Sequence, residues 1–457
     1  MKTLLKNGFV VTGTGVRKQD ILMEGERIMS MGSLTEPADE VVDVSGKYIF
    51  PGFIDGHTHF DLEVSGTVTA DDFASGTRAA LAGGTTVILD FATQNKGETL
   101  KEAYENWEKK AAKGCSCDYG FHMAISDWNE GVKQEIPNMI ERGITSFKLY
   151  MTYPAMRLDD GTLYEVLKEL HRYGCFAGVH CENADLIDAH IREAKAEGRF
   201  GPENHPKVRP DTLEAEAVHR LMVIAGQAEA PVMVVHVTGR KALEEIRQAR
   251  AAGQTVYAET CPQYLLLDES VFEKPDFEAA KYICSPPMRS KDNQDYLWQA
   301  IAGGDVDTMA TDHCSFTMEQ KRMGQEDFSR IPNGMPGVEH RASLMFSYGV
   351  MDGRITPEKM CQVLAENPAK LYGLYPKKGI LAPGSDADLV IFDPERTSVI
   401  TAENQHYRMD YSPYEGFELK GGIWRVYLRG RLAAEDGEIL LEDTGKYLKR
   451  GLSEYHA

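Results

Sequence analysis

The sequence lacks an excess of positive charge, a long hydrophobic run and a signal peptide, and each absence excludes a class of protein. Its 50 Lys and Arg residues are outnumbered by 70 Asp and Glu residues, which gives a net charge of −20. Such a charge opposes binding to nucleic acid or to an anionic membrane. No apolar run approaches the roughly 18 residues of a membrane-spanning helix. The first eight residues read as a strand and a turn, so we expect a cytoplasmic protein.

Cysteine patterns that specify a fold are also missing. The eight cysteines are scattered, and Cys115 and Cys117 form the only close pair. This spacing excludes a disulfide framework and a four-cysteine zinc site, and it favours buried thiols in a reducing compartment. No internal repeat or low-complexity tract interrupts the chain.

The sequence contains apolar segments of strand length that alternate with longer helical stretches. This alternation is typical of an α/β fold with a parallel sheet and crossover helices. Eight such strands close a TIM-like (β/α)8 barrel. The predicted strands are Tyr48 to Ile54, Thr85 to Phe91, Asp118 to Ala124, Ser146 to Leu149, Phe176 to His180, Val232 to His236, Thr255 to Thr260 and Asp307 to Thr311.

Helices are predicted between these strands, and short β segments at the two chain ends. The helical stretches are 70–82, 100–113, 163–173, 213–225 and 240–252, with Gly83-Gly84, Gly226 and Gly253 as helix stops. Neither chain end supplies enough strands alone, so we expect both to form one small β-sandwich domain. The predicted division is 1–50 and 376–457 for the β-sandwich and tail, and 51–375 for the barrel. We interpret Met318 to Pro336 as an active-site loop.

Metal-capable side chains fall where the predicted barrel strands end. His57 and His59 lie two residues apart on an extended backbone, so they point the same way. The others are Lys148, His180, His236 and Asp312. One histidine alone is more often structural, and one aspartate alone is often a helix cap. Because active sites of such barrels lie at the carboxyl ends of the strands, the joint occurrence predicts a metal site.

Lys148 has two explanations. Ser146-Phe147-Lys148-Leu149-Tyr150 places its side chain on the interior face of an apolar strand, where a charge is costly. The structural explanation is a buried ion pair with Asp312 or another carboxylate. The functional one is that a neutral amine reacts with CO2 to form a carbamate whose two oxygens each bind one metal ion.

Several motifs together resemble the cyclic amidohydrolases, and within them the dihydropyrimidinase and D-hydantoinase group. The resemblance runs along nearly the whole chain. The motifs are Pro51 to His59, Ser146 to Tyr150, Val179 to Asn183, Val235-His236, Ala310 to Cys314, Asn333 to Glu339 and the turn Pro383 to Asp388.

The resemblance implies a binuclear centre, with zinc as the expected metal. One ion would be held by His57, His59, carboxylated Lys148 and Asp312. The other would be held by His180, His236 and the same carbamate. His313 has no ligand role in that scheme and is expected to support its neighbours by hydrogen bonding.

The same resemblance implies hydrolytic ring opening of cyclic amides by a hydroxide that bridges the two ions. Asp312 would carry the proton to the leaving nitrogen, and Tyr153 would stabilise the oxyanion. Backbone groups of Ser285 and Asn333 would bind the ring amide. The products would be N-carbamoyl amino acids, and the partner a small molecule. A homotetramer is expected.

The substrate is predicted to be a 5-substituted hydantoin, preferably D, or a 5,6-dihydropyrimidine. Dihydroorotases place an arginine after the histidine pair, whereas this chain has Phe60 and Asp61, whose charge would repel a carboxylated ring. Allantoinases generally lack the Tyr153 counterpart. A non-catalytic, dihydropyrimidinase-like assembly protein is a further alternative, although such proteins have lost metal ligands. The loops predicted to bind the 5-substituent offer Phe60, Leu62, Val64, Tyr153 and Met156.

Overall fold

The computed structural model of the chain describes residues 1–455 and contains a parallel barrel, a second large sheet and a two-stranded sheet of β7 (Glu63–Val64) and β8 (Thr67–Val68). Within these residues the barrel has eight strands in the order β15-β14-β13-β12-β11-β10-β9-β6. An isolated parallel bridge between Thr58 and His313 brings its two edges together. The strands are β6 (Phe53–Thr58), β9 (Thr85–Thr93), β10 (Asp118–Ala124), β11 (Ser146–Tyr150), β12 (Phe176–His180), β13 (Val232–Val234), β14 (Val256–Thr260) and β15 (Thr308–Met309). The predicted barrel is confirmed.

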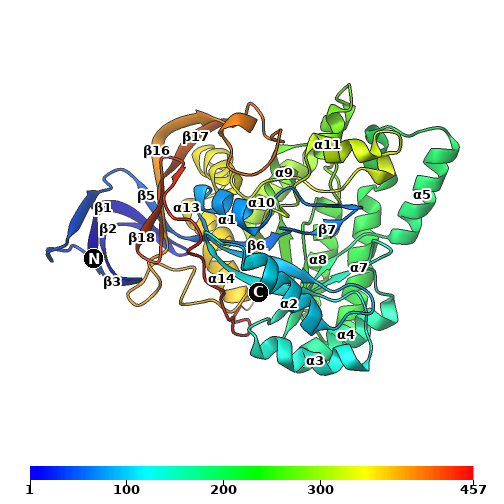
Figure 1. Ribbon diagram of the computed structural model, residues 1–457, viewed down its shortest axis with the longest axis horizontal. Helices are drawn as coiled ribbons and strands as arrows, with labels where there is room; N and C mark the ends of the chain where they lie inside the picture. The colour runs from blue at the N-terminus through cyan, green and yellow to red at the C-terminus, as the bar shows by residue number, and fades with distance from the viewer. Residues whose placement is uncertain (456–457) are drawn as a thin grey trace.

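Helices cover the outside of the barrel (Figure 1). The longer ones are α1 (Phe73–Ala82), α2 (Leu100–Ala111), α3 (Glu130–Glu141), α4 (Asp160–Arg172), α5 (Ala184–Ala196), α7 (Asp211–Ala228), α8 (Arg240–Ala251) and α10 (Asp292–Gly303). Side-chain caps begin several of them; Thr99, for example, forms a capping box with Glu102 at the start of α2. No helix of residues 1–455 is both long and apolar enough to cross a membrane.

Strands from both chain ends share the second sheet, which we call the end sheet (Figure 1). It contains β1 (Lys2–Thr12), β2 (Gly15–Glu24), β3 (Arg27–Gly32), β4 (Glu40–Asp43), β5 (Tyr48–Pro51), β16 (Leu389–Val399), β17 (Glu418–Leu428), β18 (Arg431–Glu435) and β19 (Glu438–Ile439). The join is direct, because β5 pairs with β1 on one side and with β16 on the other. The predicted association of the two ends is confirmed. The domain boundaries at residues 50 and 375 stay predictions.

Two local predictions are wrong. Tyr48 to Ile54 is not one barrel strand, because β5 belongs to the end sheet and β6 begins only at Phe53. The chain crosses between the sheets at Gly52, where any Cβ would collide with Thr86. Gly226 does not stop its helix either, since α7 continues to Ala228 and ends at Glu229, which has a φ of 54°. A side chain at Gly226 would meet Gln254, so this glycine serves close packing.

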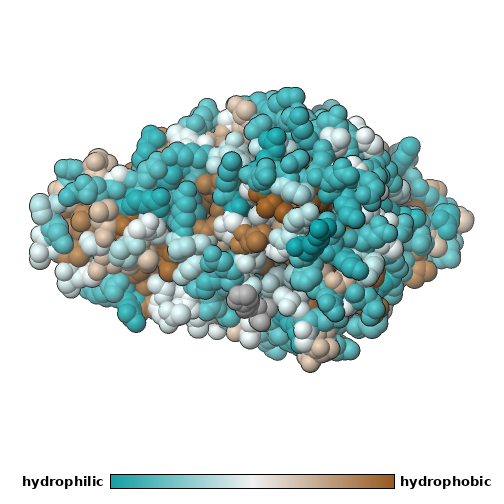
Figure 2. Space-filling view, turned by 90° about the horizontal axis from the view of Figure 1, so that it is seen from below, coloured by the Kyte–Doolittle hydropathy of each residue, from teal (hydrophilic) through white to brown (hydrophobic). Residues whose placement is uncertain are grey.

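The last described residues return to the barrel. Arg450 inserts under the strands and donates to the Ser146 Oγ at 2.8 Å, at the first residue of β11. On the face shown in Figure 2 the surface is largely hydrophilic, with hydrophobic side chains in its middle and toward the end sheet. The candidate site lies at the carboxyl ends of the barrel strands, opposite the amino end of β11 that Arg450 contacts, as this architecture predicts.

Candidate active site

The predicted site residues converge on one cavity of about 350 Å³, a size typical of small-molecule sites. His57 lies in β6 and His59 just after it, Lys148 lies in β11, and His180 ends β12. The remaining two follow short strands. His236 comes after β13 and Asp312 after β15. Tyr153, Ser285 and Asn333 line the same cavity, so the structure brings together all the predicted metal ligands and ring-binding residues.

The first cluster consists of His57, His59 and Asp312. The Asp312 Oδ1 lies 3.2 Å from the His57 Nε2 and 3.1 Å from the His59 Nε2. Burial lowers the pKa of His59 to about 4, so its imidazole is neutral at pH 7. Burial would raise the pKa of Asp312, but the adjacent His57 and His59 outweigh it and hold that pKa well below its usual range. An anionic carboxylate beside a neutral imidazole is a donor set suited to a divalent metal ion.

The second cluster consists of His180 and His236, whose ring centroids lie 4.5 Å apart. The His180 Nε2 lies 2.7 Å from the Glu182 Oε2, which leaves its Nδ1 for another partner. The His236 Nδ1 is buried and has no hydrogen-bond partner within residues 1–455. Burial holds the pKa of His236 well below its usual value. A buried nitrogen that is unpaired in the protein fits a site that takes a cation.

Lys148 lines the same cavity as both clusters, with only 1% of its surface exposed. Its Nζ is 3.5 Å from the His57 Nε2 and lies over the Phe91 and Tyr150 rings, 5.1 and 5.3 Å from their centroids. No carboxylate of residues 1–455 pairs with it at ion-pair distance. The structural explanation of Lys148, a buried ion pair, therefore fails. Burial lowers the pKa of Lys148 to about 8, which makes the neutral amine accessible near physiological pH.

Three of the predicted site residues around the cavity adopt left-handed backbone conformations that residues other than glycine rarely take. They are Tyr153 with a φ of 67°, His236 with 41° and Asp312 with 52°. Each such conformation costs on the order of 1–3 kcal/mol and persists where the surroundings fix it. All three side chains line the cavity from strained backbone positions.

Sequence reasoning missed the buried carboxylates behind the histidines. The Glu259 Oε1 lies 2.6 Å from the His57 Nδ1, and Glu182 pairs with both His180 and Arg209. Such partners fix the ring orientation of metal-ligating histidines. A signal existed for Glu259, because it is a charge inside the apolar strand β14. The His313 backbone carbonyl accepts the backbone N–H of His59 at 2.8 Å, whereas the His313 ring bonds to Asp71 and to the backbone N–H groups of Gly337 and Val338 rather than to a predicted ligand.

Two predictions about the substrate need correction. One concerns the residues that line the pocket for the 5-substituent, and the other concerns the charge of Asp61. Leu62, Val64 and Met156 line the cavity as predicted. Phe60 does not, because it is fully buried against Phe73 and His313. The Asp61 carboxylate points away from the cavity to the Lys113 Nζ at 3.2 Å. The expected repulsion of a carboxylated ring by Asp61 is therefore wrong.

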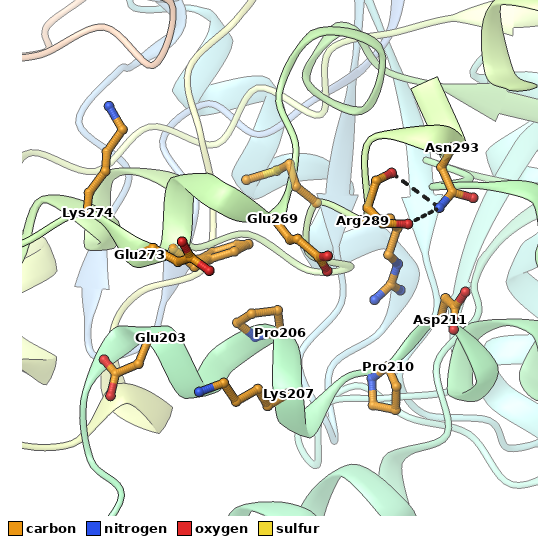
Figure 3. A pocket seen from close by; sticks show the side chains of 13 residues that line it. Glu203, Pro206, Lys207, Pro210, Asp211, Glu269, Glu273, Lys274, Arg289 and Asn293 are labelled. Carbon is orange, nitrogen blue, oxygen red and sulfur yellow. Dashed lines mark hydrogen bonds between the residues drawn. The ribbon is translucent and has the colours of Figure 1, made fainter. Parts of the chain in front are cut away.

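A larger hollow of about 770 Å³ lies elsewhere on the barrel surface. Its acidic and basic side chains are spread around the wall rather than converging on one point (Figure 3). Arg289 lines it but directs its guanidinium inward, with hydrogen bonds to Thr238 at 2.8 Å and Glu214 at 2.9 Å. The volume of a cavity therefore does not identify the active site. The smaller cavity is the candidate active site because the predicted metal ligands line it.

Comparison with known proteins agrees with this geometry. Residues 48–433 match the amidohydrolase family. The chain belongs to the amidohydrolase family. A D-hydantoinase from Geobacillus stearothermophilus is 46% identical over 98% of this chain and 97% of its own. A D-phenylhydantoinase from Escherichia coli is 43% identical over 98% of both chains. The crystal structure of dihydropyrimidinase from Brevibacillus agri has a TM-score of 0.97, with 42% identity over 99% of both chains.

As an amidohydrolase, the chain has a site that fits two metal ions rather than one. His57, His59 and Asp312 offer donor atoms within 4.8 Å of one another. His180 and His236 form a separate pair, and Lys148 lines the same cavity as both groups. The family and these groups support a binuclear metal site.

Proposed function

We propose that this amidohydrolase hydrolytically opens the ring of 5-substituted hydantoins, with a preference for the D form, and of 5,6-dihydropyrimidines. The products are N-carbamoyl amino acids. The observation that carries the proposal is that two clusters of donor side chains and the buried Lys148 line one cavity with an apolar wall. The relatives named for D-hydantoin and D-phenylhydantoin hydrolysis support the choice of substrate.

In this proposal His57, His59 and Asp312 hold one divalent ion, zinc first among the candidates, and His180 and His236 hold the other. Lys148 contributes to both after carboxylation, in which the neutral Nζ adds to CO2 and releases one proton. When bound, the two ions supply Lewis-acid chemistry and activate water near neutral pH. The low pKa of Lys148 supports carboxylation, since only the free amine reacts.

Asp312 moves the proton. Its carboxylate is ionised at neutral pH, so it accepts a proton from the attacking water and donates it to the leaving ring nitrogen. Tyr153 donates its hydroxyl hydrogen to the developing oxyanion. Burial raises the pKa of Tyr153, so the hydroxyl keeps the hydrogen that this role requires.

Ser285 and Asn333 orient the ring through backbone groups, while Leu62, Val64 and Met156 form an apolar wall for the 5-substituent. Charge supports neutral rings over carboxylated ones for a reason other than Asp61. Besides Lys148, the cavity lining contains the cation Arg209, whose guanidinium donates to the Glu182 carboxylate at 2.8 Å. Arg209 is therefore already paired with a carboxylate of the protein. Asp188 adds a negative charge to the same wall.

The test is ring opening by purified, zinc-loaded protein, with metal-free protein as control. We expect turnover of D-phenylhydantoin and dihydrouracil, slower turnover of L-phenylhydantoin, and none of dihydroorotate or allantoin. Turnover of only the last two would contradict the proposed substrates. Metal content near two ions per chain supports the enzyme, whereas protein that binds no metal would support a non-catalytic assembly role. Light scattering tests the proposed homotetramer.

A further inference from the structure

Lys321 is a second buried lysine near the cavity, outside the metal clusters. It ends the short helix α11 (Met318–Lys321) in the segment that follows the last barrel strand. Its side chain is completely buried, and burial lowers its pKa to about 7. No carboxylate of residues 1–455 forms an ion pair with it. A buried amine without a counter-charge is costly, so its contacts require an explanation.

The Lys321 Nζ donates to three backbone carbonyls. They belong to Ile283 at 2.9 Å, Pro332 at 2.7 Å and Gly334 at 2.8 Å. In its charged form the side chain has three hydrogens, one for each of the three carbonyls. The three carbonyls come from two segments that are about fifty residues apart in the sequence. The Lys321 side chain therefore connects the two segments by hydrogen bonds.

Those two segments carry the proposed ring-binding groups. Ile283 precedes Cys284 and Ser285, and Pro332 and Gly334 flank Asn333 on both sides. The segments also bond directly, since the Gly334 N–H donates to the Ile283 carbonyl at 2.9 Å. Gly334 has a φ of 155°, and a Cβ there would collide with the Cys314 carbonyl. The Lys321 amine and this backbone bond together hold the segments of Ser285 and Asn333 at a fixed spacing.

We propose that Lys321 is a positioning residue that sets the distance between the Ser285 and Asn333 backbone groups and thereby the binding of the ring amide. This inference rests on the proposed ring-opening function. Lys321 does not itself line the cavity or contact the metal clusters, and it reaches the cavity wall only through the Gly334 carbonyl. Its loss should therefore weaken substrate binding more than it slows the chemical step.

The kinetic test compares Lys321→Gln and Lys321→Met with the wild type. Glutamine keeps two N–H donors on a shorter chain, whereas methionine keeps the bulk and removes all donors. We expect KM for D-phenylhydantoin to rise in the order wild type, Gln, Met, by about tenfold or more for Met. Metal content should not change, and kcat should fall less than KM rises. Wild-type KM in both variants would overturn the proposal.

The matched control is Lys110→Met. Lys110 is also largely buried and donates to a backbone carbonyl, that of Asp61 at 2.6 Å, but it contacts neither ring-binding segment. It should leave KM unchanged. A general loss of stability would affect both lysine variants alike, so a KM change confined to position 321 identifies positioning.

A second measurement separates failure of this inference from failure of the proposed function. Hydrogen exchange followed by mass spectrometry needs no substrate, and we expect faster exchange in 283–286 and 332–335 in Lys321→Met but not in Lys110→Met. If the wild type opens none of the rings, the exchange result still decides the role of Lys321. Unchanged exchange in both segments would refute it, and Lys321→Gln serves if the methionine variant does not fold.

Discussion

Lys148 and Lys378 are both buried, yet their surroundings are opposite. Lys148 faces aromatic rings and an imidazole at the carboxyl ends of the strands, and burial lowers its pKa to about 8. Lys378 lies between the barrel and the end sheet, 2.7 Å from Asp118, 3.0 Å from Asp386 and 2.5 Å from Asp388. Although burial opposes it, these three aspartates raise the pKa of Lys378 above its ordinary value.

The difference shows how one residue type serves chemistry or architecture. Asp118, Asp386 and Asp388 lie close enough to hold a metal ion, but Lys378 contacts all three and Arg429 also pairs with Asp118. In the cavity Lys148 has no carboxylate at ion-pair distance among residues 1–455, the His236 Nδ1 has no hydrogen-bond partner there, and the backbone of His236 and Asp312 is strained. The buried lysine is therefore compensated at the junction of the two sheets and uncompensated in the cavity.

Replacing Lys148 should have the largest effect on activity. We expect Lys148→Ala to lose most of its bound metal and to slow ring opening by about 10³-fold or more, because both clusters share this residue. Metal analysis and turnover on D-phenylhydantoin measure the two effects. NMR with isotopically labelled CO2 should show a carbamate in the wild type that the variant lacks. Unchanged metal content and rate would remove the basis for the carbamate.

Asp312→Asn should come next. The amide keeps the size of the side chain but cannot accept a proton, so we expect kcat/KM to fall by about 10²–10⁴-fold. Metal content should fall less than activity, because His57 and His59 remain. The comparison is made at equal metal loading, and a rate within tenfold of the wild type would assign proton transfer to another group.

Much of this contrast could be predicted from the sequence. The eight strand segments, the association of the chain ends and the convergence of His57, His59, His180, His236 and Asp312 followed from periodicity and from the rule that strand ends meet at one face. Lys148 stood out because a charge in an apolar strand is costly. These features depend on residue type and local spacing, which a sequence displays directly.

Contacts between distant segments could not be predicted. Glu259 and Glu182 find their histidines only through the closure of the barrel, and the left-handed φ of Asp312 follows no local pattern. Asp61 was misread because its neighbour Lys113, at the end of the second predicted helix, is brought near only by folding. Phe60 was misread because burial against His313 depends on the same three-dimensional packing.

Glu259→Gln tests whether the active-site histidines depend on buried partners, as Lys378 depends on its aspartates. Glutamine still accepts from the His57 Nδ1 but without charge. We expect a fall of about 10–100-fold in metal affinity or in kcat/KM. Competition with a chelator measures the metal affinity, and turnover of D-phenylhydantoin measures kcat/KM. The control is Glu366→Gln, whose carboxylate pairs with Lys370 at 2.6 Å away from the cavity. Equal effects of both substitutions would contradict a specific role.

Lys378→Met should have the smallest effect on activity and a large one on stability. It leaves three buried aspartates without their lysine, and breaking a buried pair in this way costs about 3–5 kcal/mol. We expect lower resistance to urea but wild-type kcat per metal-loaded molecule. In the folded protein the pKa of Lys378 is raised above its ordinary value of 10.5. Its contribution to the free energy of unfolding is therefore fully present below pH 10.5 and is lost as the pH rises through the pKa of the folded state. The stability difference should thus persist unchanged from pH 7 to 10. A difference that vanished within this range, or a loss of kcat equal to that of Lys148→Ala, would contradict the division between a lysine for structure and a lysine for chemistry.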